Sequence, residues 1–379
     1  MQKAPAKIIL FGEHFVVHGS YAIAVALDKK FVDVEIVDYI DTKTAATLDE
    51  RFVEIVDCAN TKTATTTSHK PQPTSNNPQA TSNKHQPTSI NQQASNQYEL
   101  TATYNNEQVR IGGHLHTATI DMIKSFNFDN KSMKLKITSN IEGSGLGSSS
   151  AFCVAFARCL NEKWGLDYNE STNSREPCDE STFEGKNKIN ELAYIGEKAF
   201  HGNPSGIDNT ASCFGGVILF NKKMLDATGK LINYSQIKPN KKIKLIIVNT
   251  GKKSNTSKAV AKVNEFKEKH PEKFREFIAE VNHLVDDAKD AMLSCTDSDL
   301  RYLGELMLIN QSLLDMIGVS NDEIKKIITV GINNGALGGK LTGAGDGGSV
   351  ILLYDKDKDR EKIINEVEKL GYICFDIKI

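Results

Sequence analysis

The sequence predicts an α+β protein of two domains, with its functional site in the cleft between them. The 379 residues exceed the usual length of one domain, so domains are expected at residues 1–230 and 231–379. Strand-like and helix-like patterns mix in the first range, whereas mostly helical patterns fill the second. Glycine-rich loops interrupt both ranges, and such loops suit a site at a domain junction.

The first domain is expected to combine short strands with two helices. Apolar runs rich in β-branched residues predict strands at Lys7–Phe11, Ala22–Leu27, Phe31–Val37, Met133–Thr138 and Val217–Asn221. Two further runs, Tyr98–Tyr104 and Glu107–Ile111, predict a hairpin across Asn105-Asn106. Apolar residues at helical spacing predict helices over Ser149–Trp164 and Ile189–Phe200.

The second domain is expected to be mainly helical. Helical periodicity marks Thr256–Lys269, Pro271–Met292, Asp299–Ile317 and Asp359–Leu370. The sequence Ser320-Asn-Asp-Glu323 predicts a capping box that opens another helix, which Asn333-Asn334-Gly335 closes. Strands are expected at Ile243–Asn249, Ser349–Tyr354 and Tyr372–Ile377.

Two polar stretches interrupt the first domain. Residues 60–97 form a low-complexity tract of Thr, Ser, Asn, Gln and Pro, in which few side chains can bury apolar area. We expect a flexible insertion between two strands, and we favour a solvated loop without function over a binding segment. The stretch 169–188 is similarly polar and is interpreted as a connector between two helices.

Composition and charge exclude several classes of function. The net charge of −2 and the lack of a long basic run do not suggest nucleic-acid binding. Seven cysteines without CxxC spacing predict reduced thiols in a cytoplasmic protein. The N-terminus has no long apolar segment, and no run is long enough to span a membrane. The pair His114-Leu-His116 is interpreted as strand surface rather than a metal site.

The segment Ser139–Arg158 carries the strongest functional signal. Gly145 and Gly147 precede Ser148–Ser150, and an apolar helix-forming run follows. Glycines let a large anion approach the backbone amides, and the first turn of a helix offers unpaired N–H groups and a positive dipole end. These features predict a phosphate-binding loop whose serine hydroxyls cap the helix or bind Mg²⁺. An ordinary Gly/Ser loop before a helix is the alternative.

Two other segments place charged groups beside sharp turns. Near the N-terminus, a strand that carries Lys7 leads into Gly12-Glu13-His14 and on to His18. Lysine is usually a surface residue, so this segment alone does not favour a functional role. The run from Gly202 to Asn209 is rich in glycine and proline and presents Asp208 near a strand expected at Cys213–Phe220.

The carboxylate of Asp208 has two interpretations. It caps a helix, or it acts as a base or orienting group for a hydroxyl. Glu197 stands eleven residues earlier, on the preceding helix, where it is a candidate to complete a Mg²⁺ site.

A third segment, Lys340–Gly348, concentrates four glycines in six residues just before a strand. That number exceeds what a simple hairpin needs, and it lets a ligand or another chain segment approach the backbone closely. A mobile connector is the alternative, and it would be favoured if this were the chain's only glycine loop.

In order and type these segments resemble the three motifs of the GHMP kinases, the superfamily of galacto-, homoserine-, mevalonate- and phosphomevalonate kinases. The resemblance runs from about Ala4 to the C-terminus, apart from the two polar stretches. It is greatest to the mevalonate kinase family, on the segments KIILFGEHFVVHG, GSGLGSSSA, GEKAFHGNPSGIDNTASCFGG, NQSLLDMIGV and KLTGAGDGGS. Galactokinases typically read GEHTDY at the first motif, and homoserine kinases generally lack the aspartate found here as Asp208.

The resemblance implies a two-domain GHMP kinase fold with an N-terminal ATP-binding domain. It also implies that MgATP phosphorylates the primary hydroxyl of mevalonate to 5-phosphomevalonate, a step of isoprenoid biosynthesis. The family's catalytic aspartate and lysine fall on Asp208 and Lys7, and its Mg²⁺ ligands fall on Ser149 and Glu197. A homodimer is compatible with the family, and neither nucleic acid nor a membrane is implied as a partner.

The resemblance also implies the residues that bind the two substrates. ATP is expected at Gly143, Ser144, Gly145, Leu146, Gly147, Ser148 and Ser149. Mevalonate is expected at Glu13, His14, His18, Thr256, Gly343 and Ala344.

Three residues depart from the family's usual motifs. Ile141 stands where proline is usual, and Ser150 replaces an alanine, and both changes are mild. Asp346 interrupts the usual run of glycines in the third motif. Its negative charge is expected to weaken phosphate binding if it faces the ligands, and to have no effect if it points to solvent.

Two alternatives stay open at this point. One is another small-molecule kinase of the superfamily, of the galactokinase or phosphomevalonate kinase type, against which GEHFVVHG and HGNPSGIDN argue. The other is a catalytically silent ATP-binding sensor, which loss of any of Lys7, Ser149, Glu197 or Asp208 would have favoured; all four are present.

Overall fold

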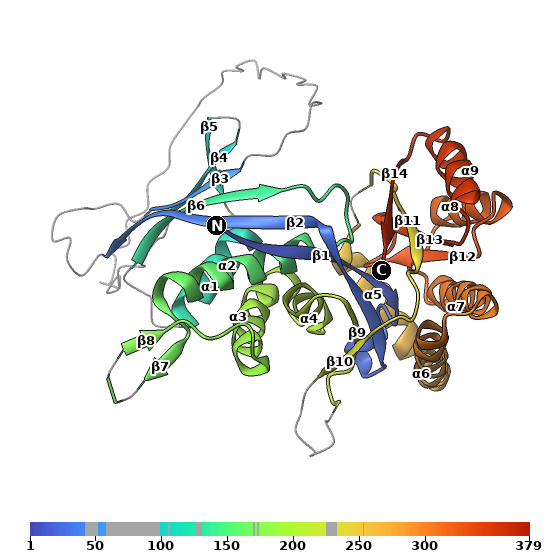
Figure 1. Ribbon diagram of the computed structural model, residues 1–379, viewed down its shortest axis with the longest axis horizontal. Helices are drawn as coiled ribbons and strands as arrows, with labels where there is room; N and C mark the ends of the chain where they lie inside the picture. Colours follow the sequence, from blue (N-terminus) through green and yellow to red (C-terminus); the bar gives the residue numbers. More distant parts are fainter. Residues whose placement is uncertain are drawn as a thin grey trace, which may run out of the picture.

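The computed structural model describes residues 1–41, 52–57, 99–104, 107–111, 113–125, 131–169, 171–172, 174–224, 233–252 and 254–379. The low-complexity tract at 60–97, which the sequence predicts to be a flexible insertion, lies outside the described residues. Within the described part, two β-sheets with separate sets of helices lie side by side and meet near β1 (Gln2–Phe11) (Figure 1).

The first sheet has eight strands in the order β10-β9-β2-β6-β3-β4-β5, and β1 pairs with β2. Its other strands are β2 (Ala22–Asp41), β3 (Phe52–Asp57), β4 (Glu99–Tyr104), β5 (Glu107–Ile111), β6 (Lys131–Ser139), β9 (Val217–Phe220) and β10 (Tyr234–Ile237). β3 runs parallel to β4 and β6, and the other pairs are antiparallel. The predicted hairpin of β4 and β5 is confirmed, and the two strands predicted between Ala22 and Val37 are one continuous strand.

Helices of the first domain cover one face of this sheet (Figure 1). They are α1 (His114–Ser125), α2 (Ser148–Trp164), α3 (Phe183–His201) and α4 (Ile207–Phe214). The interpretation of His114 and His116 as strand surface is wrong, because α1 begins there and buries Ala118 and Met122 one turn apart. The strand predicted from Cys213 is also wrong at its start, because Cys213 lies in α4 and β9 begins at Val217.

The polar stretch 169–188 is more than a connector. It includes most of a short antiparallel hairpin, β7 (Asp167–Asn169) and β8 (Ser174–Glu176), and the first turns of α3. The Thr182 hydroxyl caps α3 by accepting a hydrogen bond from the Gly185 amide, which explains why this helix starts within a polar sequence.

The second sheet has the antiparallel order β12-β13-β11-β14. Its strands are β11 (Lys244–Asn249), β12 (Gly338–Thr342), β13 (Ser349–Tyr354) and β14 (Ile373–Lys378), and its helices are α5 (Thr256–Lys269), α6 (Pro271–Ser294), α7 (Asp297–Met316), α8 (Asp322–Asn333) and α9 (Asp357–Glu368). The α5 and β13 boundaries agree with the prediction. The capping residue of α8 is Asn321, one position after the predicted Ser320, and its side chain accepts from the Ile324 amide.

One of the buried apolar clusters joins the two sheets through β1. Ile8 and Leu10 of β1 belong to the same buried cluster as Ile246 of β11 and Val350 of β13. Removing such side chains from water stabilises the contact by roughly 2 kcal/mol each, so the domains pack as one unit at the base of the cleft. The predicted boundary between the domains, after residue 230, stays a prediction.

The described residues contain no helix that is both long and apolar enough to cross a membrane. Their cysteines are free thiols, and all of these except Cys374 are buried.

Candidate active site

A cavity of about 770 Å³ lies where the two domains meet. On the side of the first domain its walls come from β1, β2 and β6, from α1, from the first turns of α2 and α4, and from the end of α3. On the side of the second domain they come from α5 and the loop between β12 and β13. Of the predicted site residues it is lined by Lys7, Glu13, His14, His18, Ser144, Gly145, Gly147, Ser148, Ser149, Glu197, Asp208, Thr256, Gly343 and Ala344. The structure therefore brings together residues that are more than 300 positions apart in the chain.

The predicted phosphate loop forms a tight turn directly before α2. Gly147 adopts a left-handed conformation with φ of 73° and precedes the first helical residue, Ser148. The Ser150 hydroxyl donates to the Gly147 carbonyl at 2.8 Å, so the serine that replaces the usual alanine closes this turn. The first N–H groups of a 17-residue helix face the cavity at this point, as an anion site requires.

Two predicted loop residues do not line the cavity. Leu146 is buried, and its carbonyl accepts a hydrogen bond from the Lys7 amide at 2.8 Å. Gly143 packs against Asn249, where an added Cβ would lie 2.8 Å from the side-chain Cγ. Both residues therefore contact neighbouring protein segments instead of lining the cavity.

The two glycine loops pack against each other across the domain junction. A Cβ on Gly145 would lie 2.9 Å from the Thr342 carbonyl oxygen, and one on Gly343 would lie 2.8 Å from the Gly145 Cα. The Ser144 hydroxyl adds a hydrogen bond of 2.6 Å to that of Ser254. The abundance of glycine in both loops therefore has a steric reason, since only glycine permits this approach.

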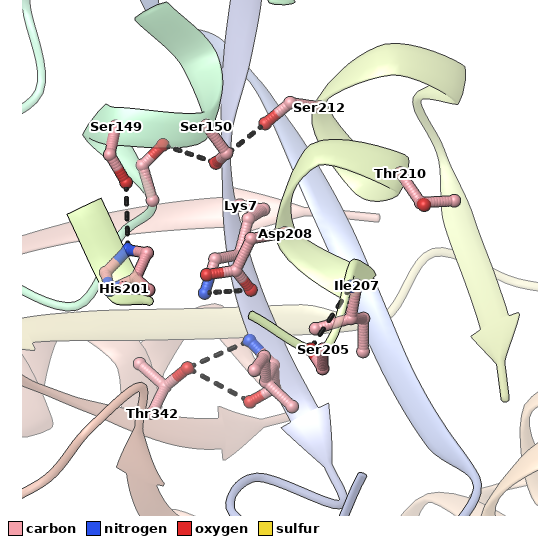
Figure 2. A network of polar contacts seen from close by, with 12 residues as sticks. Lys7, Ser149, Ser150, His201, Ser205, Ile207, Asp208, Thr210, Ser212 and Thr342 are labelled. Atoms are coloured by element: carbon pink, nitrogen blue, oxygen red, sulfur yellow. Dashed lines mark hydrogen bonds and ion pairs between the residues drawn. The ribbon is translucent and has the colours of Figure 1, made fainter. Parts of the chain in front are cut away.

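Lys7 and Asp208 form an ion pair at the centre of the site. Figure 2 shows the two side chains meeting, with a distance of 2.8 Å between Lys7 Nζ and Asp208 Oδ1. The Lys7 side chain is 2% exposed and lies tightly against Gly147, whereas Asp208 is 27% exposed. Asp208 is the second residue of α4, where the helix dipole favours a carboxylate.

Glu197 and Ser149 form a second polar cluster beside this pair. Burial, and next the charge of Asp208, raise the pKa of the Glu197 carboxyl to about 8. Its Oε1 atom is buried without a hydrogen-bond partner, and Oε2 lies 3.6 Å from the Nε2 atom of His201. The same histidine nitrogen lies 3.2 Å from the Ser149 hydroxyl (Figure 2).

This cluster has the donor atoms that Mg²⁺ prefers. A cation would supply both the partner that Glu197 Oε1 lacks and the charge that its buried carboxylate needs. The described residues contain no group of three or more His, Cys, Asp or Glu side chains arranged around a metal. One carboxylate with one hydroxyl suits Mg²⁺, which usually keeps waters and takes its remaining ligands from substrate phosphates.

The three residues of the first motif have different environments. Glu13 is paired with the fully buried Lys340, and burial raises the pKa of Glu13 and lowers that of Lys340. His14 has φ of 62°, and its Nε2 atom lies 3.0 Å from the Ala344 carbonyl oxygen. Burial lowers the pKa of His14 to about 4, so the ring is neutral and donates to this carbonyl at neutral pH. His18 stands edge-on to the Phe274 ring.

The opposite wall belongs to the second domain. Thr256, Val260 and Asn264 follow each other at four-residue spacing on α5 and face the cavity. Asp346, whose orientation the sequence left open, neither lines the cavity nor points freely to solvent. It pairs with Lys262 of α5 at 2.5 Å.

Sequence reasoning missed His201 and Lys340 as parts of the site. His201 stands next to the recognised Gly202–Asn209 segment, and its spacing of four residues from Glu197 on one helix was the available signal. Lys340 opened the third segment, but nothing local indicates that it pairs with Glu13.

Family models match a segment of each domain. The family model described as GHMP kinases N terminal domain matches residues 114–216, and the one described as GHMP kinases C terminal matches residues 288–373. A mevalonate kinase of Arabidopsis thaliana is 29% identical, over 98% of this chain and 95% of its own. A mevalonate kinase of Pyrococcus furiosus is also 29% identical, over 94% of this chain and 90% of its own.

Solved structures share the fold. L. major mevalonate kinase in complex with R-mevalonate has a TM-score of 0.67 at 24% identity and covers 99% of this chain and 95% of its own. Lactococcus lactis galactokinase complexed with galactose has a TM-score of 0.61 at 17% identity, over 100% of this chain and 92% of its own. Since enzymes with different acceptors share the fold, the fold alone does not choose the acceptor.

Proposed function

Because the chain belongs to the GHMP kinase family, we propose that it transfers the γ-phosphoryl group of ATP to the primary hydroxyl of mevalonate. The observation that carries this proposal is the ion pair between the buried Lys7 and the partly exposed Asp208, which lies in one cavity with the phosphate loop at the start of α2. Mevalonate is favoured as acceptor because relatives similar along nearly the whole chain bear the name mevalonate kinase.

Asp208 is the group that acts on the acceptor hydroxyl. Its carboxylate pairs with Lys7 and its backbone lies in the first turn of α4, so it is positioned before substrate binds. It orients the hydroxyl or accepts its proton as the oxygen attacks the γ-phosphorus. The Lys7 ammonium, only 2.8 Å away, stabilises the charge on the attacking oxygen and on the transferred group.

The ATP phosphates occupy the loop that ends at Gly147. The N–H groups at the start of α2 bind their oxygens, together with the hydroxyls of Ser144 and Ser148. The cavity also has an apolar part, lined by Val32, Leu115, Ile137, Phe152 and Phe200, which is suited to the flat base of the nucleotide.

Ser149 and Glu197 would hold Mg²⁺. When bound, the ion neutralises phosphate charge and supports the in-line geometry of transfer. The Glu197 carboxyl provides the buried charge for this, and His201 holds the Ser149 hydroxyl on the cavity side. These roles explain why a carboxyl is kept in a site where burial alone opposes its ionisation.

The acceptor end is formed by both domains. His18 and Thr256 contribute polar groups, and the glycine loop contributes Gly343 and Ala344. His14 fixes the loop through the Ala344 carbonyl. The Glu13 carboxylate is already paired with Lys340, so we assign Glu13 a supporting role for the acceptor site rather than a direct charge contact.

The test is ADP release from MgATP by the purified protein. Mevalonate, phosphomevalonate, galactose and homoserine are offered separately. Turnover with mevalonate alone is the expected result. Turnover with another acceptor instead would keep the phosphoryl-transfer site but overturn the acceptor assignment, and nucleotide binding without turnover on any acceptor would favour a silent sensor.

A further inference from the structure

Asp346 is the residue whose side chain joins the glycine loop Gly343–Gly348 to helix α5. Four of the six residues from Gly343 to Gly348 are glycines, and Ala344 adds only a methyl group. The Asp346 carboxylate pairs with the Lys262 ammonium of α5 at 2.5 Å, and the two side chains are 16% and 33% exposed. The pair therefore joins two parts of the second wall of the cavity.

The glycine loop does not need this ion pair for its own shape. The Asp346 amide donates to the Val319 carbonyl at 2.8 Å, and the Gly348 amide donates to that of Lys252 at 2.9 Å. Gly345 is so close to Val319 that an added Cβ would lie 2.1 Å from its carbonyl oxygen. Since backbone contacts fix the loop, the partner that the ion pair restrains is α5.

Helix α5 needs such a restraint because it buries little of its own surface. Of its 14 residues, only Ala259 and Val263 are fully buried, and Phe266 packs partly buried against the rings of Phe274 and Phe277. At 3.6 residues per turn, Lys262 lies on one side of this narrow apolar stripe, and the cavity-lining Val260 and Asn264 lie on the other. Rotation of α5 about its own axis would move the cavity-lining residues. An ion pair on the side of the apolar stripe away from the cavity resists this rotation.

We propose that Asp346 and Lys262 act as positioning residues: their ion pair holds α5 in the orientation that binds the acceptor substrate. The pair would set acceptor affinity rather than the rate of phosphoryl transfer, because it contacts neither Lys7 nor Asp208. The choice of mevalonate as acceptor rests on the proposed function, whereas the restraint of α5 does not. The same pairing explains how this chain tolerates a carboxylate within a glycine run beside the proposed acceptor site.

Four variants test the pair. Asp346→Asn removes the charge but suits the left-handed backbone, whose φ is 54°, because asparagine is among the residues that adopt it most readily. Lys262→Met removes the partner, the double variant removes both, and Lys262→Arg keeps the charge. Lys269→Met is the matched control, since it breaks an exposed ion pair with Glu265 on the same helix.

The expected result is a threefold to tenfold rise in the KM for mevalonate in each single charge-removing variant, with kcat within twofold of the parent. The double variant should be no worse than the poorer single one, because both remove the same interaction. Lys262→Arg and Lys269→Met should match the parent. Hydrogen exchange of α5 amides should be faster in the three variants that break the pair. Added KCl should raise the parent KM towards that of Asp346→Asn.

Unchanged KM and unchanged exchange in α5, or effects that multiply in the double variant, would overturn the proposal. Failure of the proposed function has a different signature. If the parent protein does not turn over mevalonate, the acceptor is wrong, but exchange in α5 still decides whether Asp346 and Lys262 restrain the helix.

Discussion

The two walls of the cavity are built in different ways. The first wall carries its charged groups on β1 and the turn that follows it, on α3 and on α4, and Lys7 and Glu197 are almost fully buried. The second wall lines the cavity with Thr256, Val260, Asn264 and backbone of the glycine loop, and within the described residues it adds no charged side chain to the lining. Charge is thus concentrated on the wall that belongs to the larger sheet.

This difference separates two requirements of a transferase. Charged groups that stabilise phosphoryl transfer must be held before the reaction, which burial in a packed core provides. Acceptor binding needs a surface that differs among related enzymes, and a helix with little buried area can be repositioned at small cost. Substitutions in the first wall should therefore reduce kcat, and substitutions in the second should change KM.

The largest effect is expected from Asp208→Asn in the first wall. Removing the charge while keeping the shape should lower kcat by about 10³-fold, the scale of a lost general base. The KM for ATP should change little, because the proposed role of Asp208 is on the acceptor hydroxyl. Steady-state kinetics and nucleotide titration measure the two quantities, and Asp315→Asn on α7 is a control outside the cavity. A kcat within tenfold of the parent would refute the assigned role.

Gly147→Ala should reduce kcat by about 10²-fold, because the new methyl group displaces the Lys7 ammonium without removing it. The new Cβ would lie 2.7 Å from the Lys7 Cε atom, so the ammonium must move away from Asp208. Gly215→Ala is the matched control: its φ of 72° is close to the 73° of Gly147, but nothing lies within 4 Å of its Cβ. Equal losses in both variants would point to backbone strain instead of Lys7 displacement.

Glu197→Gln should weaken Mg²⁺ binding by roughly tenfold or more, the scale reported for lost metal-site interactions. A neutral amide cannot supply the charge that compensates a divalent cation in a buried site. The shift in melting temperature on adding Mg²⁺ with a non-hydrolysable ATP analogue measures this without turnover. Glu191→Gln, on the same helix, serves as control. An undiminished shift in Glu197→Gln would exclude this carboxylate as a ligand.

The sequence predicted much of the first wall and little about how its parts meet. Resemblance named Lys7, Ser149, Glu197 and Asp208, because each stands inside a contiguous motif, and the structure brings all four into the lining of one cavity. Their catalytic and metal-binding roles stay predictions. The Glu13–Lys340 pair was not predictable, since its partners are 327 positions apart and only the packing of β12 beside the first motif brings them together. Long-range pairing of this kind has no local signature.

The fold predictions missed the starts of helices that lie within polar or glycine-rich sequence. The glycine and proline before Asp208 were interpreted as a turn leading to a strand, yet Gly206 is the residue before the first turn of α4. The helical assignment of α5 was correct because Asn255 caps it and the His270-Pro271 break ends it, both of which are local signals. Nothing local indicated that Lys262 would meet Asp346.

The smallest expected effect concerns His14, through which the first motif contacts the second wall. Its pKa is lowered from 6.5 to about 4, so the unfolded chain binds a proton in this range that the folded protein excludes. Stability should therefore fall as pH decreases from 6.5 to 4, by at most roughly 3 kcal/mol from this residue.

His14→Gln keeps a donor for the Ala344 carbonyl but does not titrate, so its denaturant midpoint should fall less over this interval than that of the parent. His283→Gln, at an exposed position of α6, should behave like the parent. If His14→Gln showed the same acid dependence as the parent, the neutral His14 imidazole would not be the cause of the loss of stability at low pH.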